Sequence, residues 1–501
     1  MNAIARSKNQ NNIYLIYISA IAISILLSLW MGIRTTVINP DAICYLESAN
    51  MIGTDGLHQA MQLCGQAKWP FYSLLIYGFA TFTQLSSLIA ANILDGLFSL
   101  ISVASFIYLV RLLGASRRTL WLAAATILLA HQFNSVREYI IRDHGFWAFY
   151  LVSISACIHY FRSPRWSYAL LWSMSIMIAA LFRIEGALFL VGVPMLVWFQ
   201  PTKRFAQFLQ LNTLTIVAGI GVAILLFSSH HEVGRLTDIE MQLAHGYELL
   251  THQFLVAKAS LAHNVLSPYS AKDAGLILSL LFFVWYLQSV IANLSLIYAV
   301  LAVYAWSRKL VRLDHSAKLV IVGYVLVNLL VTAAFLIENM FLSKRYLIAL
   351  TLILMLWVPF ALEALITERK QPRWVLPVVI MTIAVYALGG IFDFGSPKTY
   401  LREAGQWLAA NTQDNTKIYS NNEQVMYYSH HFGHTLFQQS RLFSDMTEVA
   451  NGKWKQYDYL ALRVQKNELT NNSIIQELTM SPVKVFGNKH GDQVVIYQVS
   501  R

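Results

Sequence analysis

Charged residues are scarce in this chain of 501 residues: Asp, Glu, Lys and Arg together make up 13% of it, whereas hydrophobic residues make up 56%. So little charge excludes an ordinary soluble domain, in which about a quarter of the residues are charged. Mean hydropathy is +0.50, and long apolar runs recur up to about residue 392. Together these features predict a polytopic α-helical membrane protein.

Common ligand-binding motifs are also missing. The sequence has no internal repeat, P-loop, GxGxxG, CxxC pair or HExxH motif. Histidines gather in two places, at His230 and His231 and at His430, His431 and His434. Adjacent histidines do not by themselves present a tetrahedral ligand set, so we expect solvated loop residues, no catalytic metal and no tightly bound cofactor.

Runs of about twenty apolar residues predict eleven membrane crossings. The first run follows Arg6 and Lys8, as a signal peptide would, but it is 21 residues long and no small-residue cleavage site follows it. We therefore predict a retained span. The predicted spans are residues 13–33, 86–113, 119–135, 145–161, 167–182, 184–199, 208–228, 275–306, 318–337, 346–366 and 374–391.

Lys and Arg cluster in every second connection, which is the pattern that the positive-inside rule requires of cytoplasmic loops. The clusters are Arg6 and Lys8; Arg111, Arg117 and Arg118; Arg162 and Arg165; Lys203 and Arg204; Arg308, Lys309, Arg312 and Lys318; and Arg369, Lys370 and Arg373. The N-terminus is then cytoplasmic and the long polar segments lie outside, on the periplasmic side of a bacterial inner membrane. Because loop topology explains the net charge of +11, we expect no nucleic-acid partner.

The first outer loop, residues 34–85, has local structure signals of its own. Residues 42–51 predict a short helix lying along the membrane, residues 53–56 a turn, and residues 70–82 an amphipathic helix that begins with proline. Cys44 and Cys64 both lie in this loop, where oxidation is permitted. A disulfide between them and two free thiols remain about equally open, because sequence does not give the distance between their Cα atoms.

The chain changes its pattern after residue 392, where short periodic segments replace long apolar runs. One segment predicts a helix and four predict strands, the last two flanking a hairpin turn at residues 487–492. These segments are residues 400–410, 417–420, 457–464, 483–486 and 494–499. We therefore predict a transmembrane module, residues 1–392, followed by an extracytoplasmic α/β domain, residues 393–501.

Polar residues stand out at the predicted outer ends of the spans, where they could form a site for a charged, membrane-borne substrate. Each also has a plainer interpretation: Asp41 could cap the helix that follows it, Lys68 and Arg345 could reach the interface as span anchors, and Asp143 could form a surface ion pair. For Arg183 and Glu185 we favour a structural pair. Asp95 lies within a span, where an unpaired carboxylate is costly, so it should have a partner or face a cavity.

At these residues the chain resembles the GT-C class of polyprenyl-phosphate-sugar-dependent glycosyltransferases, particularly the protein O-mannosyltransferases and the lipid A aminoarabinose transferase. The similarity rests on Asp41, Tyr45 and Ala49 in a D-x-x-x-Y-x-x-A pattern, Lys68-Trp69-Pro70-Phe71-Tyr72 where the family shows K-P-P-L-Y, Arg142-Asp143, Arg183-x-Glu185-Gly186, Arg345-Tyr346 and a soluble C-terminal domain. The chain departs from the family at Ala42, where a second acid often follows the first, and at Trp69, which replaces a proline.

The resemblance implies an integral-membrane glycosyltransferase that moves a sugar from a polyprenyl-phosphate donor, its co-substrate, to an acceptor on the outer side, whether lipid, glycan or protein. It implies that Asp41 is the general base, with inversion at the anomeric carbon, and that Asp143 orients the acceptor or holds Arg142. Donor phosphate would be bound by Lys68, Arg142, Lys344 and Arg345, with support from Glu47, Asp95, Arg183 and Glu185.

Two other classes of function remain open from the sequence. A secondary transporter would have a midplane site built from broken helices and internal repeats, and a non-catalytic envelope assembly protein would tolerate Asp41→Asn. A glycosyltransferase requires that Asp41, Lys68, Arg142, Asp143 and Arg345 converge on one cavity at the outer membrane boundary.

Overall fold

The computed structural model describes residues 2–201, 203–228, 248, 251–368, 372–392, 394–395, 397–413, 415–432, 441–442, 447–466, 478 and 480–499. The chain forms two compact units. Unit 1 comprises residues 1–27, 97–136 and 142–392, and unit 2 comprises residues 28–96, 137–141 and 393–501. The expected boundary at residue 392 differs from this division, because the first outer loop groups with the C-terminal segment.

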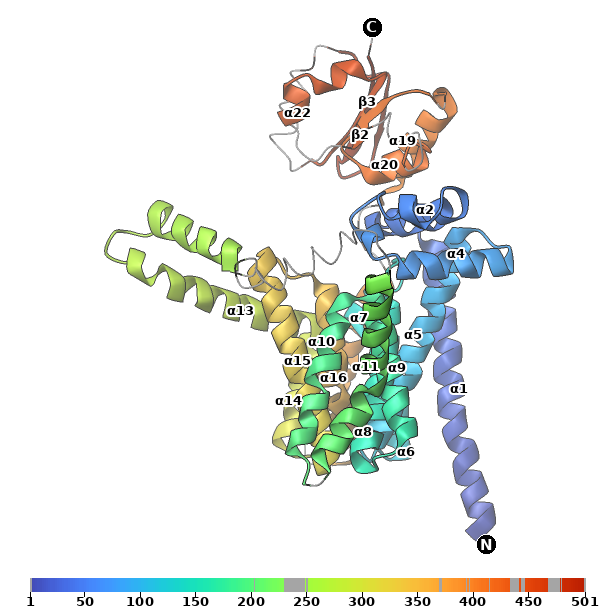
Figure 1. The fold of residues 1–501 in the computed structure, drawn as a ribbon, viewed down its shortest axis with the longest axis vertical. Helices are drawn as coiled ribbons and strands as arrows, with labels where there is room; N and C mark the ends of the chain where they lie inside the picture. The colour runs from blue at the N-terminus through green and yellow to red at the C-terminus, as the bar shows by residue number, and fades with distance from the viewer. Residues whose placement is uncertain are drawn as a thin grey trace. The chain divides into compact units, whose positions relative to one another are not determined.

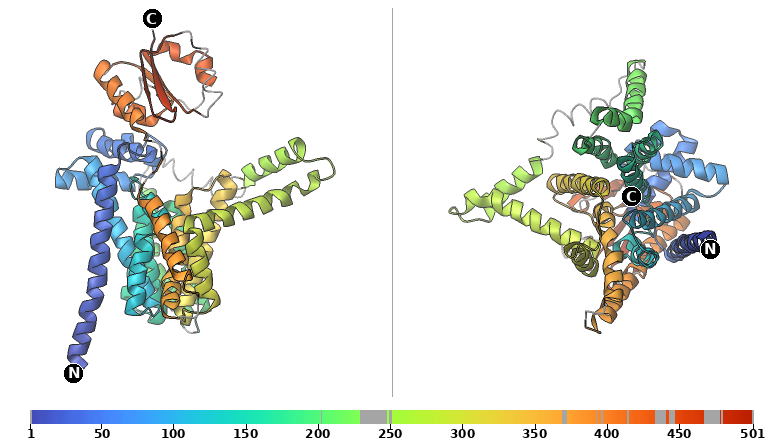
Figure 2. Two further views of the ribbon diagram at one scale, coloured as in Figure 1. Left: turned by 180° about the vertical axis from the view of Figure 1, so that it is seen from behind. Right: turned by 90° about the horizontal axis from the view of Figure 1, so that it is seen from below.

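Unit 1 is a bundle of helices (Figures 1 and 2). Two helices, α1 (Asn2–Arg34) and α5 (Ser87–Leu112), contribute to both units. The remaining helices are α6 (Arg117–Leu128), α7 (His131–Ser135), α8 (Asp143–Arg162), α9 (Trp166–Phe182), η2 (Ile184–Gly186), α10 (Ala187–Gly192), η3 (Pro194–Phe199), α11 (Arg204–Ser228), η4 (Ala271–Asp273), α13 (Ala274–Leu294), α14 (Leu296–Ser307), α15 (His315–Asn339), η5 (Lys344–Leu347), α16 (Ile348–Leu354), η6 (Met355–Trp357), α17 (Val358–Thr367) and α18 (Val375–Ile391).

Helix α8 lies at the centre of this bundle and packs against α9 and α15. Most of its side chains are buried, as expected for a helix that is apolar on all sides. Its few polar groups are satisfied inside the bundle: Ser153 Oγ lies 2.8 Å from Tyr324 Oη, which also accepts a hydrogen bond from Trp172 Nε1 at 2.9 Å. Buried polar groups therefore fix the register of α8, α9 and α15.

The basic connections meet at one end of the bundle. Arg162, the last residue of α8, forms a 2.5 Å ion pair with Asp314, just before α15, and donates to the backbone oxygen of Leu112 at the end of α5. At the same end Arg308 lies 3.5 Å from Glu368. This agrees with the grouping of cationic loops expected from the sequence, while the side of the membrane that this end faces stays a prediction.

Five of the described helices are long and apolar enough to cross a membrane: Ile13–Arg34, Ser87–Leu112, Ala271–Leu294, His315–Asn339 and the continuous segment Lys344–Thr367. Five shorter apolar helices accompany them: Phe71–Thr83, Trp166–Phe182, Ile184–Phe199, Leu296–Ser307 and Val375–Ile391. The polytopic helical class is confirmed, but the number of eleven spans is not.

Two of the predicted spans are wrong, because the structure divides each of them into two helices. Residues 275–306 form two helices rather than one, separated at Ser295, whose φ of 64° is incompatible with a continuing right-handed helix. Just before the break, the Asn293 amide donates to the backbone oxygen of Lys344 and accepts from Thr351 Oγ1 at 2.9 Å. These tertiary contacts fix the position of the break, and the apolar pattern of residues 275–306 does not predict it. The predicted span 119–135 is likewise divided, because α6 ends at Leu128.

Unit 2 combines the first outer loop with the C-terminal segment. Its elements, besides the ends of α1 and α5, are α2 (Pro40–Thr54), α3 (Leu57–Ala60), η1 (Gln66–Lys68), α4 (Phe71–Thr83), α19 (Thr399–Asn411), β1 (Ile418–Ser420), α20 (Glu423–Tyr428), β2 (Arg441–Leu442), α22 (Thr447–Ala450), η7 (Lys453–Gln456), β3 (Tyr459–Val464), β4 (Lys484–Gly487) and β5 (Gln493–Gln498). The helices predicted in the loop match α2 and α4, and the helix predicted after residue 392 matches α19.

The described strands form one five-stranded sheet in the order β2-β1-β3-β5-β4. Strands β2 and β3 are labelled in Figure 1. Strand β1 runs parallel to β2 and β3, whereas β5 is antiparallel to β3 and β4. The predicted strands match β1, β3, β4 and β5, and β2 was not predicted. The turn between β4 and β5 is closed by Asn488, whose Oδ1 accepts from the backbone nitrogens of His490 and Asp492, both at 3.0 Å.

Candidate active site

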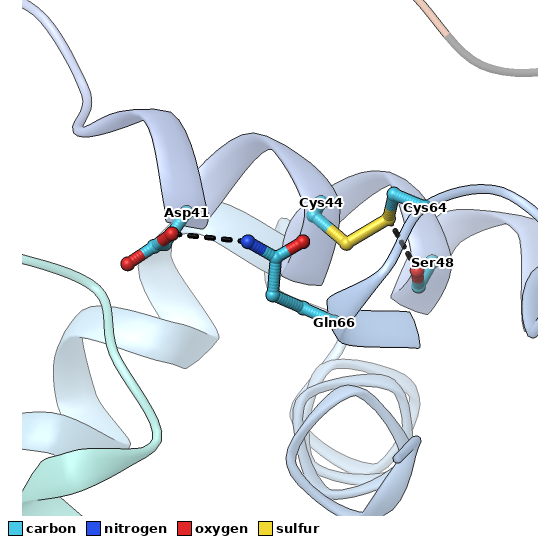
Figure 3. Close-up of a disulfide and its surroundings, with 5 residues drawn as sticks. All are labelled: Asp41, Cys44, Ser48, Cys64 and Gln66. Carbon is cyan, nitrogen blue, oxygen red and sulfur yellow. Dashed lines mark hydrogen bonds between the residues drawn. A yellow bond between two sulfur atoms is a disulfide. The ribbon is translucent and has the colours of Figure 1, made fainter. Parts of the chain in front are cut away.

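Asp41 lies in the first turn of α2, one residue after Pro40. The N-cap is Asn39, so Asp41 does not occupy the capping position that its plainer interpretation required. Its half-buried carboxylate accepts a hydrogen bond from Gln66 Nε2 at 3.1 Å across the loop (Figure 3). No sequence pattern singles out Gln66, because 25 residues separate it from Asp41.

A disulfide holds this pair together. Cys44 on α2 is bonded to Cys64, two residues before Gln66, with 6.1 Å between the Cα atoms (Figure 3). The structure thus contains the first of the two alternatives that the sequence left open. Because the bond ties η1 to the first turns of α2, it limits how far the Gln66 amide can move from the carboxylate of Asp41.

Removing the disulfide is expected to destabilise unit 2. Cys64→Ser should lower the free energy of unfolding by about 2–4 kcal/mol, because the reduced loop has more freedom when unfolded. The measurement is thermal unfolding of the detergent-solubilised protein with and without reductant. Reductant should lower the melting temperature of the wild type and leave that of Cys64→Ser unchanged; alkylation of both cysteines in the untreated native protein would contradict the bond.

The segment before α2 is fixed by residues far away in the sequence. Asn39 Oδ1 accepts from the backbone nitrogen of Ile140 at 2.9 Å, and its Nδ2 donates to the Ile140 oxygen at 3.3 Å. Asp95, which is 5% exposed, accepts from Tyr72 Oη at 2.8 Å and from the backbone nitrogen of Ile141 at 3.4 Å. Asp95 therefore has the partner expected of a buried carboxylate, and its two hydrogen bonds link α5 to Tyr72 and Ile141.

Two further predicted residues lie in the same loop. Lys68 is exposed and belongs to η1, the short turn that carries Gln66. Glu47 is half-buried on α2, and burial raises the pKa of its carboxyl to about 7, against the effect of a hydrogen bond from Asn50. Unit 2 thus brings together Asp41, Gln66 and the segment of Lys68.

In unit 1 a buried arginine joins two of the predicted acids. Arg183 follows α9 and is 6% exposed, and its guanidinium pairs with Asp143 at the start of α8 and with Glu185 at 2.5 Å. Arg142 lies close enough to Glu185 for their charges to interact. The structural pair expected of Arg183 and Glu185 is present, while Asp143 pairs with Arg183 and holds that side chain in place.

The turn that follows α9 and carries Glu185 requires glycine at position 186. A Cβ on Gly186 would come within 2.7 Å of the Cα of Ala180, so only glycine lets the chain fold back against the end of α9. Gly145, on α8 just after Asp143, meets the same requirement, because its Cβ would lie 2.3 Å from the Phe182 ring. Both close approaches set the position of the Arg183 guanidinium.

Adding a methyl group at Gly186 is expected to destabilise the protein. Gly186→Ala should lower the free energy of unfolding by about 1–3 kcal/mol, because the added methyl group meets backbone atoms that cannot move aside. Thermal unfolding is the measurement, with Gly219→Ala on α11 as the control, since no atom lies within 4 Å of a Cβ there. Equal melting temperatures for the two variants would show that a methyl group fits at position 186 without strain.

A hollow lies beside Arg183 in unit 1. Its polar wall is formed by Arg183, Glu185, Asn328, Thr332 and Arg345, and its apolar wall by Phe146, Trp147, Phe189, Val331, Phe335, Tyr346 and Ala349. The Tyr346 ring lies between the two guanidiniums, with its centroid 4.2 Å from Cζ of Arg183 and 5.5 Å from Cζ of Arg345. The Arg183 guanidinium is paired with Asp143 and Glu185, so Arg345 is the cation of this wall that is suited to binding an anionic group.

Lys344 and Arg345 both belong to η5, which is held through the bond from Asn293 to the Lys344 oxygen. Lys344 is exposed, whereas Arg345 is half-buried and lines the hollow. Tyr346 was noted in the sequence as part of the Arg345-Tyr346 motif, but Asn293 and Asn328 were missed. Buried amides within apolar runs could have drawn attention to Asn293 and Asn328.

The predicted residues therefore fall into two sets. Asp41, Glu47, Lys68 and Asp95 belong to unit 2, whereas Arg142, Asp143, Arg183, Glu185, Lys344 and Arg345 belong to unit 1. Each set is assembled within its own unit, and the convergence of the two sets on one cavity stays a prediction.

No group of three or more His, Cys, Asp or Glu side chains suited to a metal ion occurs among the residues that the structure describes. The expectation of solvated histidines is wrong for His431, which is buried and whose Nδ1 lies 2.6 Å from the backbone oxygen of Ser429. His230, His231 and His434 lie outside the described residues.

No protein-family model and no curated protein matches this sequence. Among solved structures, the chain is similar to ArnT from Cupriavidus metallidurans bound to undecaprenyl phosphate, at 12% identity and a TM-score of 0.52, over 96% of this chain and 97% of that one. The apo structure of the same protein gives 12% identity and a TM-score of 0.50 over 98% of both chains.

The arabinofuranosyltransferase AftD from Mycobacteria, as its R1389S mutant, gives 14% identity and a TM-score of 0.47 over 97% of this chain. This chain spans about two fifths (41%) of the length of AftD. The fold comparison therefore rests on ArnT, whose length is matched almost completely. The chain has the fold of ArnT, and the GT-C-like architecture predicted from its sequence is confirmed.

Proposed function

We propose that this protein is an integral-membrane glycosyltransferase that moves a sugar from a polyprenyl-phosphate donor to a hydroxyl acceptor. The observation that carries the proposal is the ArnT fold, matched over almost the full length of both chains, including a structure of ArnT bound to undecaprenyl phosphate. The hollow with Arg183 and Arg345, and the carboxylate of Asp41 held by Gln66, supply chemistry that such a reaction needs.

The proposed reaction requires one base and several cations. Asp41 takes the proton of the acceptor hydroxyl while its oxygen attacks the anomeric carbon. The bond from that carbon to the phosphate oxygen breaks, its electron pair stays with the phosphate, and the sugar is joined to the acceptor with inversion. Polyprenyl phosphate and a protonated Asp41 remain.

Negative charge builds up on the leaving phosphate, so cations placed there stabilise the transition state. We assign this role to Lys68, Arg142, Lys344 and Arg345. Arg345 is the best supported of them, because it lines the aromatic hollow and a guanidinium can bind two phosphate oxygens at once. Asp143 and Glu185 fix Arg183, which forms part of the wall of the hollow.

The setting follows from the same proposal. The apolar helices lie in the bilayer of a bacterial inner membrane with the N-terminus in the cytoplasm, and the C-terminal segment lies on the periplasmic side. The donor reaches the site from the membrane. The acceptor, a lipid, glycan or protein, reaches it from the outer side, and no tightly bound metal or cofactor takes part.

The test is transfer of label by the purified full-length protein in lipid nanodiscs. The protein is incubated with a panel of radiolabelled undecaprenyl-phosphate sugars and an acceptor extract from bacterial envelopes. We expect protein-dependent loss of label from at least one donor, and saturable binding of undecaprenyl phosphate that is weaker in Arg345→Ala. The matched control is Arg165→Ala, an exposed arginine between α8 and α9.

Failure of every donor, together with no saturable binding of undecaprenyl phosphate, would overturn the proposal. It would favour a secondary transporter or a non-catalytic envelope assembly protein, the alternatives open from the sequence. Binding of undecaprenyl phosphate that is equally tight in Arg345→Ala and Arg165→Ala would remove Arg345 from the phosphate site.

A further inference from the structure

The short helix α20 lies against α2, the helix that carries Asp41. Gln424 Nε2 donates to the backbone oxygen of Ile38 at 2.6 Å, and Tyr428 Oη accepts from the backbone nitrogen of Ile38 at 3.1 Å. Both backbone polar groups of Ile38, three residues before Asp41, are therefore bound by side chains of the C-terminal segment. Nothing in the sequence indicated this contact, which joins residues about 390 positions apart.

Helix α20 is itself firmly held. Asn422 caps it by accepting from the backbone nitrogen of Val425 at 3.0 Å. The preceding residue, Asn421, pairs with the backbone of Arg463 in β3, accepting from its nitrogen at 2.7 Å and donating to its oxygen at 2.9 Å. The sheet thus fixes the first turn of α20, and with it the position of Glu423.

Glu423 is half-buried in this first turn, beside Gln424. Burial raises the pKa of its carboxyl, and the negative charge of Asp41 raises it further. One turn along α20, burial and then the charge of Glu47 raise the pKa of Tyr427 to about 12. Asp41 and Glu47 of α2 are thus close enough to Glu423 and Tyr427 of α20 for their charges to act on them, as expected for two helices in contact.

We propose that Glu423 is a positioning residue of the candidate active site, a second carboxylate that the C-terminal segment places opposite Asp41. This inference rests on the function proposed for Asp41. When Glu423 is ionised, its negative charge repels that of Asp41, and this repulsion is relieved when the acceptor's proton passes to Asp41. The acceptor's proton still passes to Asp41, and Glu423 itself forms and breaks no bond.

Other titratable groups surround this contact and must be considered in any pH dependence. They are Asp41 and Glu47 on α2, Tyr427 and Tyr428 on α20, and Arg402 on α19, whose side chain donates to the backbone oxygen of Thr36 at 3.0 Å and whose charge acts on Tyr428. Of these, the two tyrosines stay neutral in the range in which carboxyl groups titrate.

The first test compares pH profiles of sugar transfer. Glu423→Gln should lower kcat by about 3- to 10-fold near neutral pH, leave KM for the donor unchanged and move the acidic limb of the profile to lower pH. Gln424→Ala, which removes the bond to Ile38 and keeps the carboxylate, should lower thermal stability without moving that limb. The matched control is Glu403→Gln, an exposed glutamate on α19.

The second test needs no activity. Because the folded state raises the pKa of Glu423 above its value in the unfolded chain, stability is lost as the pH rises from about 4.5 through the folded value. Without the negative charge of Asp41, the pKa of Glu423 is raised less, so less stability is lost over this pH range. Asp41→Asn should therefore raise the melting temperature more at pH 8 than at pH 4 in the wild-type background, and the difference should vanish in the Glu423→Gln background.

Failure of the Glu423 proposal and failure of the proposed function give different results. Additive effects of Asp41→Asn and Glu423→Gln on the melting temperature at both pH values would overturn the pairing, whatever the activity. An unmoved acidic limb in Glu423→Gln would overturn its influence on Asp41. If wild-type protein turns over no donor, the proposed function fails, while the melting-temperature cycle still decides whether the two carboxylates face each other.

Discussion

Asp41→Asn is expected to lower the rate of sugar transfer by about 10²- to 10⁴-fold, the usual contribution of a positioned general base. The amide has nearly the shape of the carboxylate and can still contact Gln66, so the loop should keep its structure. The measurement is transfer from the labelled donor at saturating concentration, with the melting temperature recorded for the same preparation. A loss in kcat without a comparable rise in KM indicates an interaction made in the transition state.

The control for this variant is Asp55→Asn. Asp55 is an exposed carboxylate at the end of the same helix, and its Oδ2 accepts a hydrogen bond from Thr54 at 3.0 Å. Its replacement should leave the transfer rate within a factor of two of wild type, since a solvated carboxylate away from the reacting atoms supplies no base. Equal rates for Asp41→Asn and wild type would remove Asp41 from catalysis and leave it as part of the α2 fold.

The second large effect is expected from Arg183→Ala, which should lower the free energy of unfolding by about 3–5 kcal/mol. Asp143 has a side chain only 4% exposed, and without the guanidinium its charge would be buried with no cation beside it. The variant should therefore unfold at a markedly lower temperature and lose binding of undecaprenyl phosphate, because the wall of the hollow collapses. Thermal unfolding in nanodiscs and a binding assay measure the two effects.

Arg162→Ala is the matched control. Arg162 also pairs with an aspartate, Asp314, but the two side chains are 31% and 47% exposed, so water screens the pair. Its loss should cost less than about 1 kcal/mol. The double variant Arg183→Ala/Asp143→Asn should recover part of the lost stability, because the uncompensated charge is gone. If it recovers none, packing around Tyr346 and Phe146 contributes more than charge to the effect of Arg183.

The continuously apolar helices and the strand pattern were the most predictable parts of the fold. Residues 145–161 and 167–182 read as spans because they are continuously apolar, and α8 and α9 occupy almost the same residues. The hairpin of β4 and β5 was predictable because alternating residues flank a Gly-Asn turn. Ser295 was not predictable, since the apolar pattern continues through it and only the contacts of Asn293 with a distant segment indicate the break.

The residues of the candidate site also differ in whether they could be predicted from the sequence. Asp41, Lys68, Asp143, Arg183 and Arg345 were identifiable because charged residues at the ends of apolar runs are conspicuous. Their partners were not identifiable: Gln66 and Glu423 are ordinary polar residues in polar segments. A pairing between residues 25 or nearly 400 positions apart depends on how the loop and the sheet pack, which no local pattern encodes.

The sequence by itself determined that this chain is a polytopic helical protein with a small α/β segment, since both depend on hydrophobic periodicity within short windows. Only the tertiary structure decided which partner each acid has: Asp143 forms an ion pair with Arg183, whereas Asp95 accepts a hydrogen bond from Tyr72 and Asp41 accepts one from Gln66. The reason is physical. Burial preference is a property of each residue and its neighbours along the chain, whereas a partner is chosen by packing between elements that the chain brings together only when it folds.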